Sequence, residues 1–256
     1  MKGYGLYMPI DNSISVIIPT ADREQLLRRA VDSVLKQSVL PSKIIVVDNG
    51  VNKVNIKFDD PRVAVIRTEP RIGPGRSRNI GARNSDTNYI AFLDDDDWWD
   101  SGYIENTIRK FEDTNADVVV GRLRRYSIDG CLKDYKLFPD RPDLQRKVFF
   151  SNPGFGGQNI AMKKEVFVEV GGFDERMPAS VDRDLAARLI VSGKSIACEP
   201  KAVAILCDHT GRRVRTSQVK GNWMFVRKHW RQMRSKELFR ALMILLKRAI
   251  LDLAGR

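Results

Sequence analysis

The apolar run at residues 89–93 is followed at once by four aspartates, residues 94–97, and then by Trp98 and Trp99. A β-prone run that stops at acidic residues is typical of a buried strand whose carboxylates reach the carboxyl edge of a sheet, where open α/β folds bind ligands. Carboxylates packed this closely repel one another unless a cation joins them, and hard oxygen ligands suit Mg²⁺ or Mn²⁺. A solvated acidic turn is the alternative, but the strand and the two tryptophans favour a metal site.

Strand and helix patterns alternate through the first half of the chain. Continuous apolar runs at residues 14–19, 43–47, 63–67 and 89–93 are typical of strands, and residues 23–37, 75–85 and 101–114 are predicted helices. This alternation predicts an α/β fold whose mostly parallel sheet is flanked by helices and joined by right-handed crossovers. Asp22 is expected to cap the first helix.

Acidic residues follow three of the predicted strands. Asp22 lies beyond the first, Asp48 ends the second, and the four aspartates follow the fourth. Because parallel strands end at one edge of a sheet, this convergence is how α/β proteins assemble nucleotide sites. The chain has neither a Walker-type phosphate loop nor the glycine fingerprint of dinucleotide-binding folds. Arginines crowd the second predicted helix and the segment just before it, where they either bind phosphate or solvate the helix: Arg71, Arg76, Arg78 and Arg83.

The net charge of +12 is concentrated near the C-terminus, where residues 209–256 hold 13 Lys and Arg against two acidic residues, a net of +11. Within this region residues 238–253 have the spacing of a basic amphipathic helix, too interrupted by charges to span a bilayer. Such a helix either lies on an anionic membrane face or packs against the body or a second copy of the chain, and the sequence leaves these alternatives open. We expect a domain at residues 1–215 and a basic amphipathic helical extension at residues 216–256.

The cysteines and the N-terminus bear on location. Cys131, Cys198 and Cys207 form an odd set without the spacing of a metal site, which fits a reducing compartment. Residues 1–10 lack the long apolar core of a secretory signal. We therefore expect a cytoplasmic protein, at the inner face of the cell membrane if the basic helix binds lipid.

Several motifs resemble, in order and spacing, the family-2 glycosyltransferases of GT-A fold, over roughly residues 13–210. They are ISVIIPT at 14–20, VVDNG at 46–50, RNIGA at 78–82, LDDDD at 93–97, GGFDE at 171–175 and DRDL at 182–185. The resemblance implies a nucleotide-diphospho-sugar donor, a divalent metal (Mn²⁺ or Mg²⁺) and transfer with inversion at the anomeric carbon. UDP is the favoured nucleotide.

The resemblance also implies roles on the donor side of the site. Asp94 corresponds to the carboxylate that meets the donor ribose, Asp96 to the one that binds the metal, and Asp48 to the one that accepts a hydrogen bond from the base. His209 corresponds to a further metal or diphosphate contact in some GT-A enzymes, although a lone histidine near a strand end is often structural. The remaining nucleotide-sugar-binding candidates are Thr20, Arg23, Arg78 and Asp95.

On the acceptor side, an inverting enzyme needs one general base to take the proton of the attacking hydroxyl. Asp182 matches the family's basic aspartate. The position before it is commonly glutamate but is Val181 here, which leaves Asp184 as a rival for the base. The alternative role for Asp182 is the N-cap of a helix at residues 183–192.

Neither the Gln-x-x-Arg-Trp element nor the spanning helices of processive synthases are present in the sequence, so we expect a non-processive hexosyltransferase that moves single sugars. We expect its acceptor to be a glycan or a lipid-linked molecule, in polysaccharide or lipopolysaccharide biosynthesis.

Two other classes of protein are alternatives. A sugar nucleotidyltransferase would carry a basic, glycine-rich signature near the first strand, where the chain offers only Arg23. A nucleic-acid-binding module would explain the basic C-terminal region but not the acidic run, so no nucleic acid is expected. Whether the chain is a homo-oligomer stays open.

Overall fold

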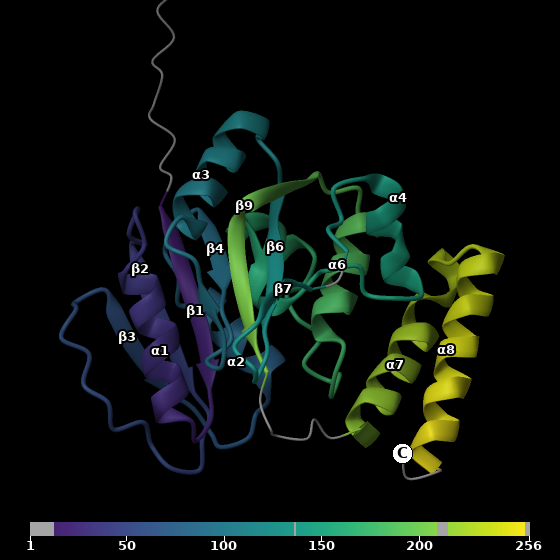
Figure 1. Cartoon of the computed structure of the whole chain (residues 1–256), viewed down its shortest axis with the longest axis horizontal. Helices are drawn as coiled ribbons and strands as arrows, with labels where there is room; N and C mark the ends of the chain where they lie inside the picture. Colours follow the sequence, from purple (N-terminus) through teal and green to yellow (C-terminus); the bar gives the residue numbers. More distant parts are fainter. Residues whose placement is uncertain (1–12, 136, 209–214, 254–256) are drawn as a thin grey trace, which may run out of the picture.

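The computed structural model of the chain describes residues 13–135, 137–208 and 215–253, and Figure 1 shows how its elements are arranged. The helices are α1 (Glu24–Leu35), α2 (Pro74–Arg83), α3 (Tyr103–Thr114), α4 (Pro142–Gln145), α5 (Lys164–Glu169), α6 (Val181–Val191), α7 (Arg215–His229) and α8 (Ser235–Leu253). The strands are β1 (Ile14–Thr20), β2 (Lys43–Asp48), β3 (Val63–Arg67), β4 (Tyr89–Phe92), β5 (Trp98–Trp99), β6 (Val118–Tyr126), β7 (Leu132–Asp134), β8 (Ile160–Lys163) and β9 (Ile196–Cys207).

One sheet holds these strands in the order β3-β2-β1-β4-β8-β6-β9-β5, with β7 paired to β6. The half formed by β3, β2, β1 and β4 is parallel, as the alternation of strands and helices predicts. The second half is mixed, because β8 runs antiparallel to both β4 and β6, whereas β9 runs parallel to β6. The predicted α/β fold with helices flanking the sheet is confirmed, and the parallel half brings the ends of β1, β2 and β4 to one edge.

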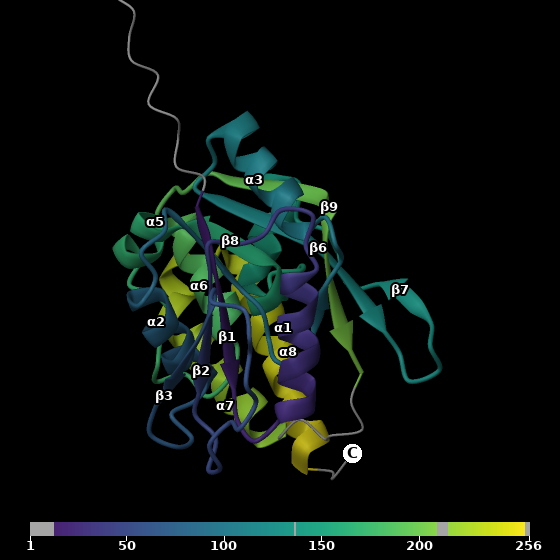
Figure 2. The same cartoon turned by 90° about the vertical axis from the view of Figure 1, so that its left-hand side faces the viewer.

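Helices cover both faces of the sheet. Alternate residues of β1 point to opposite sides, so Ile17 belongs to one core cluster while Val16 and Ile18 belong to the other. Leu27 of α1 and Tyr103 of α3 fill the second cluster, and the first contains buried residues of α2, α6, α7 and α8, among them Ala82, Leu185, Phe225 and Leu245. Figure 2 shows α1 and α2 on opposite sides of the strands.

Helices α7 and α8 lie at the end of the molecule farthest from β3 (Figures 1 and 2). Phe225 of α7 is fully buried, and Arg146 clamps α8 through two 2.8 Å contacts between its guanidinium and the carboxylate of Glu237. One side of α8 thus packs against the body. The opposite side exposes a row of apolar residues, Phe239, Leu242, Met243, Leu246 and Ile250. In the described parts of the chain, none of the helices combines the length and apolarity needed to cross a membrane.

The predicted cap of the first helix is wrong. Helix α1 begins after Arg23, and no side chain caps it. Asp22 instead adopts a positive φ of 56°, and its carboxylate accepts hydrogen bonds from the backbone N–H groups of Val51 at 3.0 Å and Asn52 at 2.8 Å. These two bonds lower the pKa of Asp22. The carboxylate therefore ties the end of β1 to the loop after β2, which a local capping rule does not foresee.

Candidate active site

The acidic run forms the loop between β4 and β5. Oxygens from Asp94, Asp96 and Asp97 all lie within 4.8 Å of one another, whereas Asp95 is not part of this set. Three convergent carboxylates are a donor set that suits Mg²⁺ or Mn²⁺, so the residues fit the metal that the sequence predicts. Asp97, which sequence reasoning did not single out, is buried and accepts the backbone N–H of Cys207 at 2.9 Å. This bond joins the loop to the end of β9.

Asp95 points inward. Its carboxylate accepts a hydrogen bond from Thr20 Oγ1 at 2.7 Å and lies 2.6 Å from Nη2 of Arg23. Burial raises the pKa of Asp95 to about 7, although Arg23 and Thr20 act in the opposite direction. Arg23 also contacts Asp96 Oδ2 at 2.8 Å and remains 45% exposed. Three predicted donor-binding residues, Thr20, Arg23 and Asp95, are thus brought together, and they hold the acidic loop against the end of β1.

Asp48 lies beside Thr20 in the register of the parallel strands. It is fully buried, and its carboxylate accepts hydrogen bonds from Gly50 N at 3.0 Å, Val54 N at 2.8 Å and Arg67 Nη1 at 2.7 Å. The carboxylate therefore shapes the loop after β2. Sequence reasoning missed Arg67. The sequence shows that Arg67 ends the predicted strand at residues 63–67, but the register that sets it beside Asp48 comes from the structure.

Arg78 connects the acidic loop to α6. The buried guanidinium of Arg78 donates through Nη2 to Asp94 Oδ1, and its Nη1 lies 3.7 Å from Asp182 Oδ1. Burial lowers the pKa of Arg78, but the charges of Asp94 and Asp182 outweigh it and raise that pKa overall. Arg78, Asp94 and Asp182 line one cavity of about 660 Å³. Two carboxylates that lie far apart in sequence therefore face the same space.

Asp182 is not the N-cap of its helix, and this alternative is wrong. Helix α6 begins at Val181, and Ser180 precedes it in the left-handed conformation with φ of 61°. Asp182 consequently lies within the first turn, and its side chain is 28% exposed on the cavity. A carboxylate in the first turn is stabilised by the helix dipole in its ionised form.

Asp184, the rival base, lies in a different environment. It is fully buried, and its carboxylate has 2.8 Å contacts with His229 Nε2, Lys228 Nζ and Arg188 Nε. Burial raises the pKa of Asp184, but the hydrogen bond from His229 and the charge of Arg188 outweigh it, so the pKa falls to about 2. Asp184 is not among the residues that line the cavity. It joins α6 to the end of α7.

The two tryptophans after the acidic run differ in their surroundings. Trp99 is buried, stacks on Tyr103 with 4.0 Å between ring centroids, and donates from Nε1 to Gln158 O at 2.8 Å. Trp98 is partly exposed and carries the guanidinium of Arg29 4.5 Å from its ring centroid. Trp99 therefore fills the space beneath the acidic loop. His209, the predicted further metal contact, lies outside the described residues.

Comparison with known proteins agrees with this architecture. The model of glycosyl transferase family 2 matches residues 15–171. Glycosyltransferase GlyA of Streptococcus pneumoniae is 33% identical over 120 residues, which is 44% of this chain and 17% of GlyA. The putative colanic acid biosynthesis glycosyl transferase WcaA of Escherichia coli is 27% identical over 84% of this chain and 81% of its own length. The chain spans less than two thirds of the length of GlyA and of other curated relatives.

Among solved structures, the crystal structure of S. aureus TarS 1–349 in complex with UDP-GlcNAc is similar in fold. The TM-score is 0.69 at 16% sequence identity, over 92% of this chain and 72% of that one. The family match covers more than half of the chain, and the curated relatives carry glycosyltransferase names. The predicted enzyme class is thereby confirmed at the level of the family, and the chain belongs to glycosyl transferase family 2.

Proposed function

We propose that the chain is an inverting, metal-dependent glycosyltransferase that moves a single hexose from a nucleotide-diphospho-sugar, with UDP as the favoured nucleotide, to a hydroxyl of a glycan or lipid-linked acceptor. The observation that carries this proposal is the joint placement of two features in one cavity. Arg78 links a carboxylate of the acidic loop, Asp94, to a carboxylate on α6, Asp182. A metal-type cluster on one side and a base on the other is the arrangement that inversion needs, because the nucleophile enters opposite the leaving group.

On the donor side, the end of β1 and β2 with the acidic loop forms the nucleotide pocket. Thr20 and Asp48, which end neighbouring strands, would line the base side of this pocket, and Asp94 would meet the ribose. Asp96 would hold the cation, with Asp97 within reach. His209 stays a predicted further ligand. When bound, Mn²⁺ or Mg²⁺ offsets the charge that builds on the departing diphosphate. Arg23 pairs with Asp96 and is half exposed, so its guanidinium has room to turn from the carboxylate to a phosphate.

On the acceptor side, Asp182 takes the proton of the attacking hydroxyl. Its carboxylate lies 3.7 Å from Nη1 of Arg78 and is 28% exposed on the cavity, so it can reach a hydroxyl bound there. Asp184 does not suit this role, since three basic side chains contact its carboxylate and it does not line the cavity. Arg78 orients Asp94 and Asp182 at once and keeps the donor ribose and the base in a constant relation.

The stereochemistry of the reaction tests this proposal without knowledge of the acceptor. Incubated with UDP-glucose or UDP-GlcNAc and Mn²⁺, the chain should slowly transfer the sugar to water. Because the donor sugar is the α anomer, ¹H NMR spectra recorded before mutarotation should show the β anomer of the released sugar. Release of the α anomer would contradict inversion by a single base, and an Asp143→Asn variant, altered at an exposed carboxylate, should behave as the wild type.

The relatives' names and the C-terminal helices support a surface-bound acceptor. WcaA is named for colanic acid biosynthesis, and TarS was crystallised with UDP-GlcNAc, which fits a UDP-sugar donor and a glycan acceptor here. The exposed apolar row of α8 borders exposed basic residues, Lys236, Arg240 and Lys247. In this proposal α8 makes peripheral contact with an anionic membrane, at the inner face of the cell membrane.

Vesicle flotation tests the membrane contact. The chain should float with vesicles that contain anionic phosphatidylglycerol and not with neutral ones. The double variant Leu242→Glu, Leu246→Glu should lose most of this binding, because it places two carboxylates on the exposed apolar row. Ile128→Glu, at an exposed apolar residue after β6, is the matched control. Equal flotation of wild type and double variant would reject the membrane contact, and a dimer disrupted by the double variant would assign the row to a second copy.

A further inference from the structure

The cavity that contains Asp182 has a second charged region, centred on Arg183. This arginine follows Asp182 on α6 and is only 7% exposed. Its Nε donates to Val148 O at 2.6 Å and its Nη1 to Asn222 Oδ1 at 3.1 Å, while its guanidinium stacks on Phe225 at 3.8 Å. Within the described residues, Nη2 has no hydrogen-bond partner and no carboxylate forms an ion pair with Arg183. A buried cation that lacks a counter-ion is costly unless a ligand supplies one.

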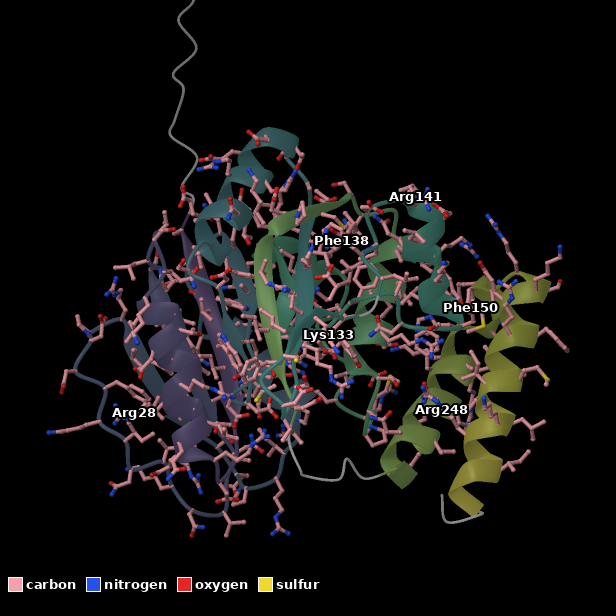
Figure 3. All side chains as sticks on the ribbon, viewed as in Figure 1. Arg28, Lys133, Phe138, Arg141, Phe150 and Arg248 are labelled. Carbon is pink, nitrogen blue, oxygen red and sulfur yellow. The ribbon has the colours of Figure 1, made fainter. Side chains whose placement is uncertain are left out.

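Two further cations line the same cavity near Arg183. Arg248 reaches it from α8, and Lys147 reaches it from the 3-10 turn η1 (Arg146–Phe149). In Figure 3, Arg248 of α8 points toward the body, and Phe150, which follows η1, lies beside the same face of α8. Burial and the charge of Arg248 lower the pKa of Arg183 to about 9, so the guanidinium stays charged at neutral pH. The cations of this cluster, Arg183, Arg248 and Lys147, are not paired with carboxylates of the described residues.

The cavity therefore has two ends of different charge. Asp94 and Asp182, bridged by Arg78, form the acidic end beside the metal-type cluster, and Arg183 with Arg248 forms the basic end beside α7 and α8. The acidic loop lies on the donor side of Asp182. Arg183 contacts Asn222 and Phe225 of α7, so the basic end lies toward the C-terminal helices. In the proposed function the acceptor enters the cavity from this end.

We propose that the basic end of the cavity binds a phosphate group carried by the acceptor, and so selects phosphorylated acceptors over neutral glycans. A phosphate oxygen would accept the unused Nη2–H of Arg183 and a second bond from Arg248, the charge-assisted arrangement for which guanidinium groups are suited. The bound phosphate would hold a neighbouring hydroxyl of the same molecule at Asp182. This inference rests on the proposed function, since it assigns the acceptor to the cavity of the proposed base.

Calorimetry tests the site directly on the full chain, with saturating UDP and Mg²⁺ present so that the donor region is occupied. The probes are glycerol 3-phosphate, geranyl phosphate and, as the neutral counterpart, glycerol. We expect both phosphates to bind and glycerol not to bind. The tighter phosphate indicates the source of the group, because geranyl phosphate adds a prenyl chain like that of a lipid carrier, whereas glycerol 3-phosphate represents a soluble or polymeric polyol phosphate.

Variants on α8 make the test specific. Arg248→Gln should weaken binding of both phosphates at least about tenfold, since a charge-assisted bond is lost, and should leave UDP affinity unchanged. Arg234→Gln removes the same charge from an exposed residue just before α8, which does not line the cavity, and should have no effect. Arg183→Met should abolish phosphate binding if it folds, and Arg248→Gln decides the matter if it does not.

Three results would overturn this inference. The first is the absence of phosphate binding in the UDP-saturated protein. The second is equal phosphate affinity in Arg248→Gln and wild type. The third is an Arg248→Gln variant that binds UDP more weakly but phosphate as before, which would place the donor diphosphate at this end. UDP affinity is measured first and separately. If the protein fails to bind UDP, the proposed donor is rejected. The phosphate site is then still tested by comparing the phosphate affinities of wild type and Arg248→Gln.

Discussion

Replacement of Asp182 by asparagine will lower the rate of sugar transfer by a factor of about 10² to 10⁴, the contribution typical of a general base. The amide cannot take the proton of the attacking hydroxyl, yet it has nearly the same shape, so it still fits beside Arg78 at the edge of the cavity. The rate is measured as release of UDP from the UDP-sugar that the wild type uses, with the preferred acceptor and separately with water.

Binding of UDP should not change in Asp182→Asn, because the proposed nucleotide pocket lies at the ends of β1 and β2 and Asp182 lies on α6. The exposed Asp143→Asn variant should keep full activity as a control for the loss of one negative charge. An Asp182→Asn enzyme that keeps more than about half of the wild-type rate would exclude Asp182 as the base, since such a change is far below what removal of a general base causes.

Replacement of Asp184 by asparagine will destabilise the fold by about 3 to 5 kcal/mol, the range expected when one partner of a buried ion pair is removed. Its carboxylate is the common partner of Arg188, Lys228 and His229, and it joins α6 to α7. Urea unfolding followed by far-UV circular dichroism measures the loss. Asp143→Asn, which breaks only an exposed contact with Arg141, should stay within about 0.5 kcal/mol of the wild type.

The same carboxylate makes stability depend on pH. The pKa of Asp184 is about 2 in the folded chain, below its ordinary value of 3.8. Its contribution to the free energy of unfolding is therefore complete when the pH is above the pKa of Asp184 in the unfolded chain. As the pH falls from about 4 to 2, this contribution decreases by about 2 to 3 kcal/mol. The difference in unfolding free energy between wild type and Asp184→Asn should shrink over this interval. A difference that is the same at pH 3 and pH 7 would show that Asp184 does not titrate as the ion cluster requires.

Local sequence patterns predicted the parallel half of the sheet well. The predicted strand at residues 63–67 coincides with β3, and the helix predicted at residues 101–114 ends with α3 at Thr114. These segments are long or strongly apolar, and each is followed by residues that stop it. The insertion of β8 between β4 and β6 was not predicted, because the order of strands in a sheet depends on contacts between distant segments and not on local periodicity.

The candidate site was predicted only in part, because some of its contacts join segments that lie far apart in sequence. The convergence of Thr20, Asp48 and the acidic run follows from parallel strands that end at one edge, and the structure brings them together. The bridge that Arg78 forms between Asp94 and Asp182 depends on how α6 packs, which no local pattern encodes. Likewise, Asp184 and His229 lie 45 residues apart in sequence, so the ion cluster could not be inferred from local sequence. For the same reason the DRDL motif could not show that Asp182 lines the cavity whereas Asp184 is buried in the ion cluster.

The proposed reaction depends on a metal-dependent UDP site at the acidic loop, and calorimetric titration of UDP with and without Mn²⁺ measures this dependence. Wild type and Asp143→Asn should bind UDP much more tightly when Mn²⁺ is present, because Asp96 and its neighbours would hold a cation that also attracts the diphosphate. Asp96→Asn should lose most of this gain while its fold stays intact. UDP binding that depends neither on Mn²⁺ nor on the side chain at Asp96, or no binding of UDP at all, would contradict a metal-dependent UDP site.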